Sequence, residues 1–252
     1  MIALERRGAV AVLTLEHGKA SAFDVELCER LIARFSECEA AWCTAVVVTG
    51  RGSIFSAGVD LVRVANEGAP YLSRFLPALS DAFEQIFAFP KPLVAAVNGH
   101  AIAGGCILAC TADWRLMARG GGRIGLPELL VGVAFPPVPI EIVRFAVNQR
   151  FAADLMFNGA TLEADAAATA GFVDAAVEPD ALLDEAIAAA ERMAARPAAA
   201  FAITKQQWRA PTLDRMREGR RQLDRRIEEI WSSAETLETI RGYIERTFKK
   251  PR

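Results

Sequence analysis

Two glycine-rich turns have the residue types of a site that holds an oxyanion. The first turn, residues 50–60, follows the apolar run 45–49, and the second, residues 98–106, follows the apolar run 93–97. A turn without bulky side chains lets a ligand approach the backbone closely. The first N–H groups of a helix have no internal partner and point outward. Two such turns brought together supply two N–H donors to one developing oxyanion, which predicts an enzyme that acts on a carbonyl.

A third segment adds a carboxylate. Glu128 follows Pro127, and a carboxylate beside a carbonyl can act as a general acid or base. Taken alone, its position after a proline favours a plainer interpretation, a helix-start carboxylate stabilised by the helix dipole. Asp60, just after the first turn, is likewise expected to cap a helix.

Other chemistries have little support in the residues. The chain has two histidines, His17 and His100, and scattered acids, so no metal set is predicted. It has no Gly-x-Ser-x-Gly segment and no Cys/His pair with convincing spacing, so nucleophilic hydrolysis is not expected.

Composition favours a globular protein with a large core. The 252 residues are 52% hydrophobic and 24% charged, which suits one large domain or a domain with an appendage. The net charge of −2 and the pI near 5.9 argue against nucleic-acid binding. Five cysteines without a CxxC pair, and a charged start without a signal-peptide core, predict a cytoplasmic protein. The longest apolar run, residues 101–110, is half of the ~20 residues a membrane span needs.

Strands and helices are expected to alternate over the first two-thirds of the chain, which predicts an α/β fold. A first helix is expected from a capping box, with Ser21 as the cap and Asp24 three residues later. Further helices are expected over residues 60–89, in two pieces, and over residues 137–158. The expected strands cover residues 10–15, 45–49, 93–97 and 113–117.

The last third of the chain has a helical pattern throughout. Pro197 ends an alanine-rich helix, and Pro211 is expected to interrupt the next one. Seven arginines between residues 209 and 226 are interleaved with acids, which is typical of a solvated helix face. The alternative is that one or two of them, or Lys205, bind phosphates.

The order of these features resembles the crotonase superfamily, the enoyl-CoA hydratase/isomerase family, over nearly the whole chain. The resemblance rests on residues 55–60, Lys91 and Pro92, Asn98 and Gly99, residues 103–106 and residues 125–129. It implies a spiral of ββα turns with a C-terminal helical region. Residues 1–196 would form the spiral core with the acyl-CoA site, and residues 197–252 a helical oligomerisation region that forms homotrimers or homohexamers.

The resemblance also implies roles for particular residues. The peptide N–H groups of Ala57 and Gly104 would hold the thioester oxygen, and Glu128 would be the acid/base. Contacts to CoA are expected from Lys19, Ala20, Ala22, Ala57, Gly58 and Asp60. CoA would be carried as part of the substrate, and no separate cofactor is expected. The last helix, with Tyr243, Arg246, Lys249 and Lys250, would approach the adenine part of CoA.

One departure from the family pattern bears on the reaction. Family hydratases use two glutamates, and the position of one of them is Ile107 here, which leaves Glu128 alone. Isomerisation of a 3-enoyl-CoA to a 2-enoyl-CoA needs one base that removes a proton from C2 and returns it at C4. The apolar, proline-rich residues 132–139 are expected to exclude water from the acyl pocket. The sequence therefore predicts an enoyl-CoA isomerase, with three alternatives: an enoyl-CoA hydratase, another crotonase-type acyl-CoA reaction, or a catalytically weak acyl-CoA binding paralogue.

Overall fold

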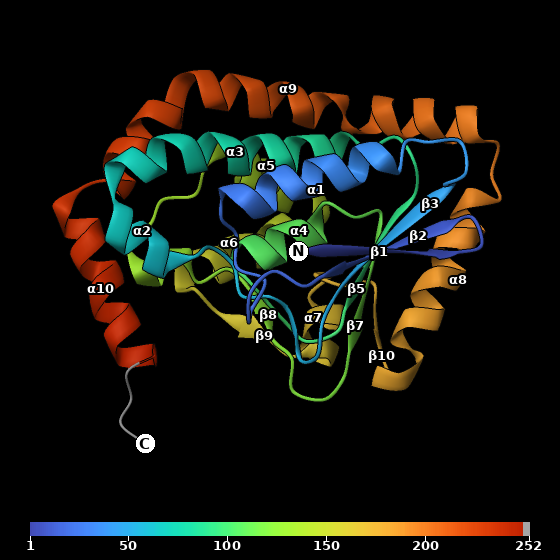
Figure 1. Cartoon of the computed structure of the whole chain (residues 1–252), viewed down its shortest axis with the longest axis horizontal. Coiled ribbons are helices and arrows are strands. Elements are labelled where there is room, and N and C mark those ends of the chain that lie inside the picture. Colours follow the sequence, from blue (N-terminus) through green and yellow to red (C-terminus); the bar gives the residue numbers. More distant parts are fainter. Residues whose placement is uncertain (249–252) are drawn as a thin grey trace.

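The computed structural model describes residues 1–248, which form two sheets wrapped by helices (Figure 1). The larger sheet has the strand order β1-β2-β3-β5-β7-β10; β1 pairs with β2 antiparallel, and the strands from β2 to β10 are parallel to one another. The smaller sheet has the order β4-β6-β8-β9. The strands of the larger sheet are β1 (Ile2–Arg7), β2 (Val10–Leu15), β3 (Ala45–Gly50), β5 (Leu93–Val97), β7 (Trp114–Ala118) and β10 (Ala175–Val177). Those of the smaller sheet are β4 (Ile54–Ser56), β6 (His100–Ile102), β8 (Ile124–Gly125) and β9 (Thr161–Leu162).

One unit, strand–strand–helix, occurs three times along the chain. β3 and β4 lead to α2 (Leu61–Glu67), and β5 and β6 lead to α4 (Gly104–Cys110). β7 and β8 lead to the short 3₁₀ helix η1 (Glu128–Val131). The first strand of each unit joins the larger sheet and the second joins the smaller one. This is the α/β spiral of ββα turns that the resemblance implied, and the expected fold class is confirmed.

Helices cover both faces of the larger sheet, which explains its long apolar strands. Alternate residues such as Val10, Val47 and Val94 pack against α8 (Leu182–Ala194), while Leu13 and Val48 face the main core. On the main-core side, α1, α3 and α9 lie in layers, with α8 on the other flank (Figure 1). The remaining helices are α1 (Val25–Glu37), α3 (Ala69–Ala88), α5 (Pro137–Ala146), α6 (Gln149–Asn158), α7 (Ala164–Thr169), η2 (Pro179–Ala181), α9 (Ala198–Trp231) and α10 (Ala234–Phe248).

Several predicted boundaries were wrong. Helix α1 is capped by Asp24, whose Oδ1 accepts a hydrogen bond from the Leu27 N–H at 2.7 Å, and Ser21 lies before the helix with φ of +46°. The helix expected over residues 137–158 is divided at Val147, which is extended and separates α5 from α6. Strand β1 was missed because its charged, exposed residues lack an apolar pattern.

Helix α9 runs through Pro211 without interruption, which corrects the expected break. A proline removes one helical hydrogen bond, and the cost is usually enough to kink or end an isolated helix. Here α9 packs along α3 and α5, and the residues around the proline, Arg209, Thr212 and Leu213, are buried. Tertiary packing therefore keeps the helix continuous where local preference would break it.

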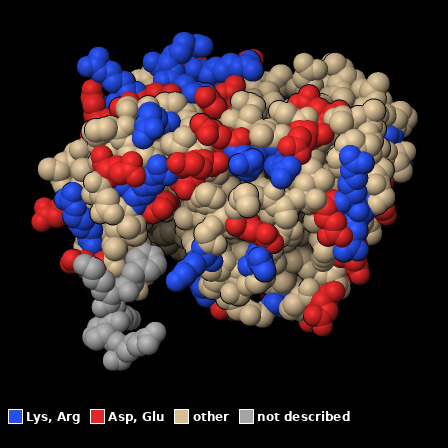
Figure 2. Space-filling model, in the orientation of Figure 1, with Lys and Arg blue, Asp and Glu red and all other residues tan. Residues whose placement is uncertain are grey.

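Many of the arginines on α9 form ion pairs with nearby acidic residues. Figure 2 shows Lys and Arg side chains along the upper edge of the molecule, over α9, with acidic side chains among them. Arg220 contacts Asp81 at 2.7 Å, and Arg215 contacts Glu141 at 2.6 Å. These pairs favour the interpretation of a solvated, ion-paired helix face. Lys249 and Lys250 lie outside the described residues.

The apolar residues of the last two helices fall into two groups. Ile227, Trp231 and Ile240 are buried within the chain, whereas Trp208, Leu223 and Ile230 are exposed. The trimeric or hexameric assembly, and the division at residues 196 and 197, stay predictions. Light scattering at micromolar concentration would test the assembly. Within residues 1–248, no helix is both long enough and apolar enough to cross a membrane.

Candidate active site

The three strand-to-helix junctions meet because their strands are neighbours in the smaller sheet. β4 pairs with β6, and β6 pairs with β8, all parallel. The residues that leave the ends of these strands therefore lie side by side and line one cavity of about 190 Å³. The first junction contributes Ala57, Val59 and Asp60, the second contributes Ala103, and the third contributes Pro127 and Glu128.

Glu128 presents a carboxyl group to this cavity. Its Oε2 is buried and has no hydrogen-bond partner among the described residues. Burial raises the pKa of Glu128 from its ordinary value of 4.5 to about 8, and the residue's own peptide N–H opposes the rise only in part. A carboxyl group with a pKa near neutrality can both take and return a proton at physiological pH. The geometry therefore fits an acid/base better than a simple helix-start carboxylate.

The peptide N–H of Ala57 is already used inside the protein. It donates to the carbonyl of Ala20 at 3.0 Å, which ties the first junction to the loop before α1. A single N–H that makes this bond is not free to hold a substrate oxygen. The expected oxyanion role of Ala57 therefore conflicts with the structure, although Ala57 does line the cavity.

Val59 carries the free donor of the first junction. The backbone of Phe23 makes a hydrogen bond to each neighbour of Val59. The Phe23 N–H donates to the Gly58 carbonyl at 2.7 Å, and the Asp60 N–H donates to the Phe23 carbonyl at 2.9 Å. Between these two bonds, the Val59 N–H has no partner within residues 1–248. Val59 lines the cavity, so an unpaired donor sits at its wall. The Gly-x-Asp spacing gave no reason to choose Val59 over Ala57.

Gly104 supplies the matching donor of the second junction. It is the first residue of α4, and its N–H has no partner among the described residues. A β-carbon on Gly58 would lie 3.4 Å from this nitrogen, which places the two junctions in contact. A β-carbon on Gly104 would itself meet the Phe23 ring at 3.1 Å. The glycines thus permit the close approach that the two donors need.

Most of the residues expected to contact CoA line this cavity or a smaller one beside it. Ala20, Ala22, Ala57 and Asp60 line it, and Lys19 lines a smaller adjoining cavity with Ala20. Gly58 packs against the second junction. Their contact with CoA stays a prediction.

Asp60 also caps a helix. Its Oδ1 accepts a hydrogen bond from the Arg63 N–H at 3.0 Å and so caps α2. That contact is the one its sequence position predicted.

The apolar wall of the cavity differs in part from the expected one. From the expected segment 132–139, Val133 lines the cavity, whereas Phe135, Pro136 and Pro137 are buried in the core, as is Ile107, and do not line it. The other apolar residues of the wall are Leu61, Val62, Ile102, Val131, Trp231 and Tyr243. Trp231 and Tyr243 come from α9 and α10, which the sequence had assigned to oligomerisation. The sequence carried no signal that singled them out, because the same helices also contain Phe201 and the exposed Trp208.

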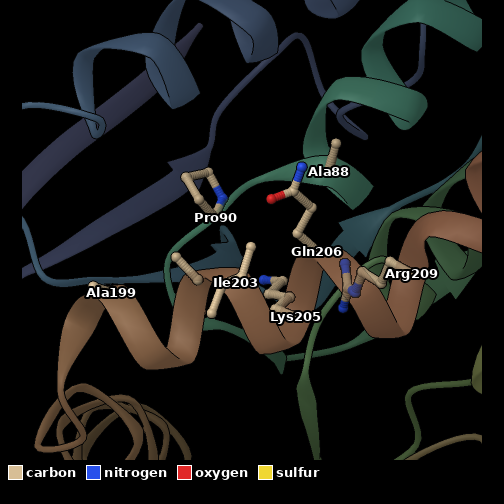
Figure 3. Close-up of a pocket in the computed structure, with 8 residues that line it drawn as sticks. Ala88, Pro90, Ala199, Ile203, Lys205, Gln206 and Arg209 are labelled. Atoms are coloured by element: carbon tan, nitrogen blue, oxygen red, sulfur yellow. The ribbon is translucent and has the colours of Figure 1, made fainter.

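A second cavity, of about 390 Å³, lies between α9 and the segment that follows α3 (Figure 3). Its cations are already neutralised by Asp113 of the α4–β7 loop. Lys205 Nζ contacts Asp113 Oδ2 at 2.6 Å, and Arg209 contacts Asp113 Oδ1 at 2.7 Å. This cluster fixes α9 to the sheet, and we assign it a structural role.

Comparison with known proteins places these features in a family. The chain matches the enoyl-CoA hydratase/isomerase family over residues 5–251. It is 31% identical to the 2,3-dehydroadipyl-CoA hydratase of Escherichia coli K12, over 82% of this chain and 80% of that protein. The protein belongs to the enoyl-CoA hydratase/isomerase family. Among its relatives, hydratase names are more frequent than isomerase names.

Solved structures agree on the fold. An apo enoyl-CoA isomerase of Mycobacterium tuberculosis superposes with a TM-score of 0.80 at 28% identity, over 91% of this chain and 96% of that one. The human mitochondrial Δ3-Δ2-enoyl-CoA isomerase superposes with a TM-score of 0.94, over 98% of both chains. At 24% identity, that second likeness concerns the fold alone.

Proposed function

We propose that the protein shifts the double bond of an acyl-CoA thioester, converting a 3-enoyl-CoA into a 2-enoyl-CoA. Glu128 removes a proton from C2, and the electron pair left on C2 delocalises onto the thioester oxygen, which gives a dienolate. The N–H groups of Val59 and Gly104 stabilise that oxyanion. Glu128 then returns the proton at C4 as the electrons return, so no atom is gained or lost.

The observation that carries this proposal is the unpaired, buried carboxyl oxygen of Glu128. The other carboxylate at the cavity, Asp60, uses Oδ1 to cap α2. A single mobile proton suits isomerisation, because the same group can serve as base and then as acid. Water addition needs a second group that holds and deprotonates water. The position where the family's hydratases carry that glutamate is the buried Ile107, which moves no proton.

The names of the relatives favour a second candidate, an enoyl-CoA hydratase. The test compares kcat/KM for isomerisation of a 3-enoyl-CoA with kcat/KM for hydration of a 2-enoyl-CoA of equal chain length. Absorbance follows the conjugated product, and mass follows the added water. We expect isomerisation to be the faster reaction. Faster hydration would favour the hydratase, and turnover of neither thioester would indicate another crotonase-type acyl-CoA reaction or an acyl-CoA binding protein.

A further inference from the structure

The active-site cavity has an open end and a closed end. At the open end, Val62 is 47% exposed and Ala20 is partly exposed. At the closed end, Val133 and Trp231 are almost fully buried, with Trp231 2% exposed. The CoA moiety is large and polar, so it must stay toward the open end. The acyl chain then extends from Glu128 toward Trp231.

Trp231 is a fixed wall of this closed end. It is the last residue of α9, and its indole Nε1–H donates to the Ala134 carbonyl at 2.8 Å. Ala134 belongs to the segment that follows η1, the helix that begins with Glu128. A buried aromatic ring with its N–H bonded has little freedom to swing aside. The indole therefore limits the depth available beyond Glu128.

The volume of the cavity limits the acyl chain to a small number of carbons. The cavity measures about 190 Å³. An apolar cavity of about 150 Å³ holds one benzene molecule, which has six carbon atoms, so this cavity has room for an acyl chain of about that size. The thioester carbonyl must occupy part of that space, beside Val59, Gly104 and Glu128.

We propose that Trp231 determines acyl-chain length and restricts the enzyme to short chains, of about four to six carbons. The inference rests on the proposed function only in placing the thioester at Glu128. The substrate class is thus a short-chain 3-enoyl-CoA, and the residue that defines it comes from the C-terminal helices.

Binding of unreactive saturated thioesters tests the proposal without any turnover. Dissociation constants are measured by calorimetry for butanoyl-, hexanoyl-, octanoyl- and decanoyl-CoA. Each methylene that enters the apolar cavity should tighten binding by about fourfold.

In the wild type we expect this gain to stop near hexanoyl-CoA. In Trp231→Ala the gain should continue, and decanoyl-CoA should bind at least tenfold more tightly than to the wild type. A wild-type affinity that still rises from octanoyl- to decanoyl-CoA would overturn the proposal, even if Trp231→Ala does not fold.

Two further variants test whether the size of the Trp231 ring, and not its hydrogen bond or a general change in α9, limits the chain length. Trp231→Phe keeps most of the ring but loses the bond to Ala134, and it should retain the chain-length limit. If Trp231→Phe bound decanoyl-CoA as tightly as Trp231→Ala does, the size of the ring would not be what limits the chain length. Trp208→Ala, on the same helix but 73% exposed, should leave the series of affinities unchanged. The reaction assay is independent, so a protein that binds short chains but does not isomerise them would refute the proposed function alone.

Discussion

Gly58 and Gly104 approach so closely that a β-carbon on Gly58 would lie 3.4 Å from the peptide nitrogen of Gly104. The same β-carbon would lie 2.8 Å from the β-carbon of Ala103. Gly58 also has φ of +86°, a conformation that side chains other than glycine rarely adopt. This contact places the unpaired N–H groups of Val59 and Gly104 on two neighbouring junctions, where Val59 and Ala103, the residue before Gly104, line the cavity.

A structure with a bound acyl-CoA should show the two donors on one oxygen. We expect the peptide nitrogens of Val59 and Gly104 about 2.7–3.1 Å from the thioester oxygen. The Ala57 N–H should remain bonded to the Ala20 carbonyl. Crystallography with a saturated acyl-CoA makes this measurement. A thioester oxygen bound to the Ala57 N–H, or to side chains alone, would contradict the assignment of Val59.

Replacing Glu128 by glutamine should remove most of the activity. The amide keeps the shape of the side chain but cannot take a proton from carbon, so kcat should fall by roughly 10²- to 10⁴-fold. Steady-state kinetics on a short-chain 3-enoyl-CoA give the value. Asp60→Asn is the matched control at the same cavity, because an amide oxygen can still cap α2; its kcat should stay within about tenfold of the wild type. Near-normal turnover by Glu128→Gln would exclude Glu128 as the acid/base.

The raised pKa of Glu128 predicts a pH dependence of both activity and stability. As a base, Glu128 must be ionised in the free enzyme, so kcat/KM should rise with pH and level off above about 8. Between pH 4.5 and about 8, the folded protein keeps a proton that the unfolded chain loses. The free energy of unfolding contributed by this group therefore falls as pH rises through that window.

Glu128→Gln has no such proton to lose. The Tm of Glu128→Gln minus the Tm of the wild type should therefore be larger at pH 8 than at pH 5. Thermal unfolding at the two pH values measures the difference. An equal difference at both would show that the carboxyl group titrates normally.

Introducing a carboxylate at position 107 should add hydration. Ile107 lies one helical turn after Ala103, to whose carbonyl its N–H donates at 3.0 Å, and Ala103 lines the cavity. We expect Ile107→Glu to raise kcat/KM for hydration of a 2-enoyl-CoA by roughly 10²-fold, since a second acid/base becomes available. Ile107→Gln, of similar shape but without an ionisable group, is the control. A folded Ile107→Glu that gains no hydration would show that the missing carboxylate is not the barrier.

Removing the charge of Asp113 should destabilise the protein strongly. Its carboxylate is the shared partner of Lys205 and Arg209, whose side chains are 6% and 3% exposed. Asp113→Asn leaves two buried cations without a counter-charge, which typically costs about 3–5 kcal/mol. Asp81 pairs with Arg220 but is half exposed, so Asp81→Asn should cost less than about 1 kcal/mol. Urea unfolding compares the two variants, and equal costs would refute the structural role of Asp113.

The residues alone determined the architecture and most of the site's location. Residues 45–49 and 93–97 are apolar at every position but one, which predicts strands of a parallel sheet that are buried on both faces. The glycine-rich turns mark where the chain leaves these strands on its way to a helix. Glu128, Gly104 and the capping role of Asp60 could be named because each depends on local chain geometry and on the resemblance to a family. These features are encoded within a few neighbouring residues.

Contacts between distant segments decided the rest. The family resemblance implied Ala57 as the donor, but the Ala57 N–H bonds to the Ala20 carbonyl, whereas the Val59 N–H has no partner among the described residues. Pro211 should end a helix, but packing against α3 and α5 carries α9 past it. Trp231 reaches the cavity from the far end of that helix and forms part of its wall. Local sequence specifies which backbone N–H groups lie in the turns and could donate to a ligand. Only the tertiary structure determines which of these groups are already hydrogen-bonded within the protein and which side chains line the cavity.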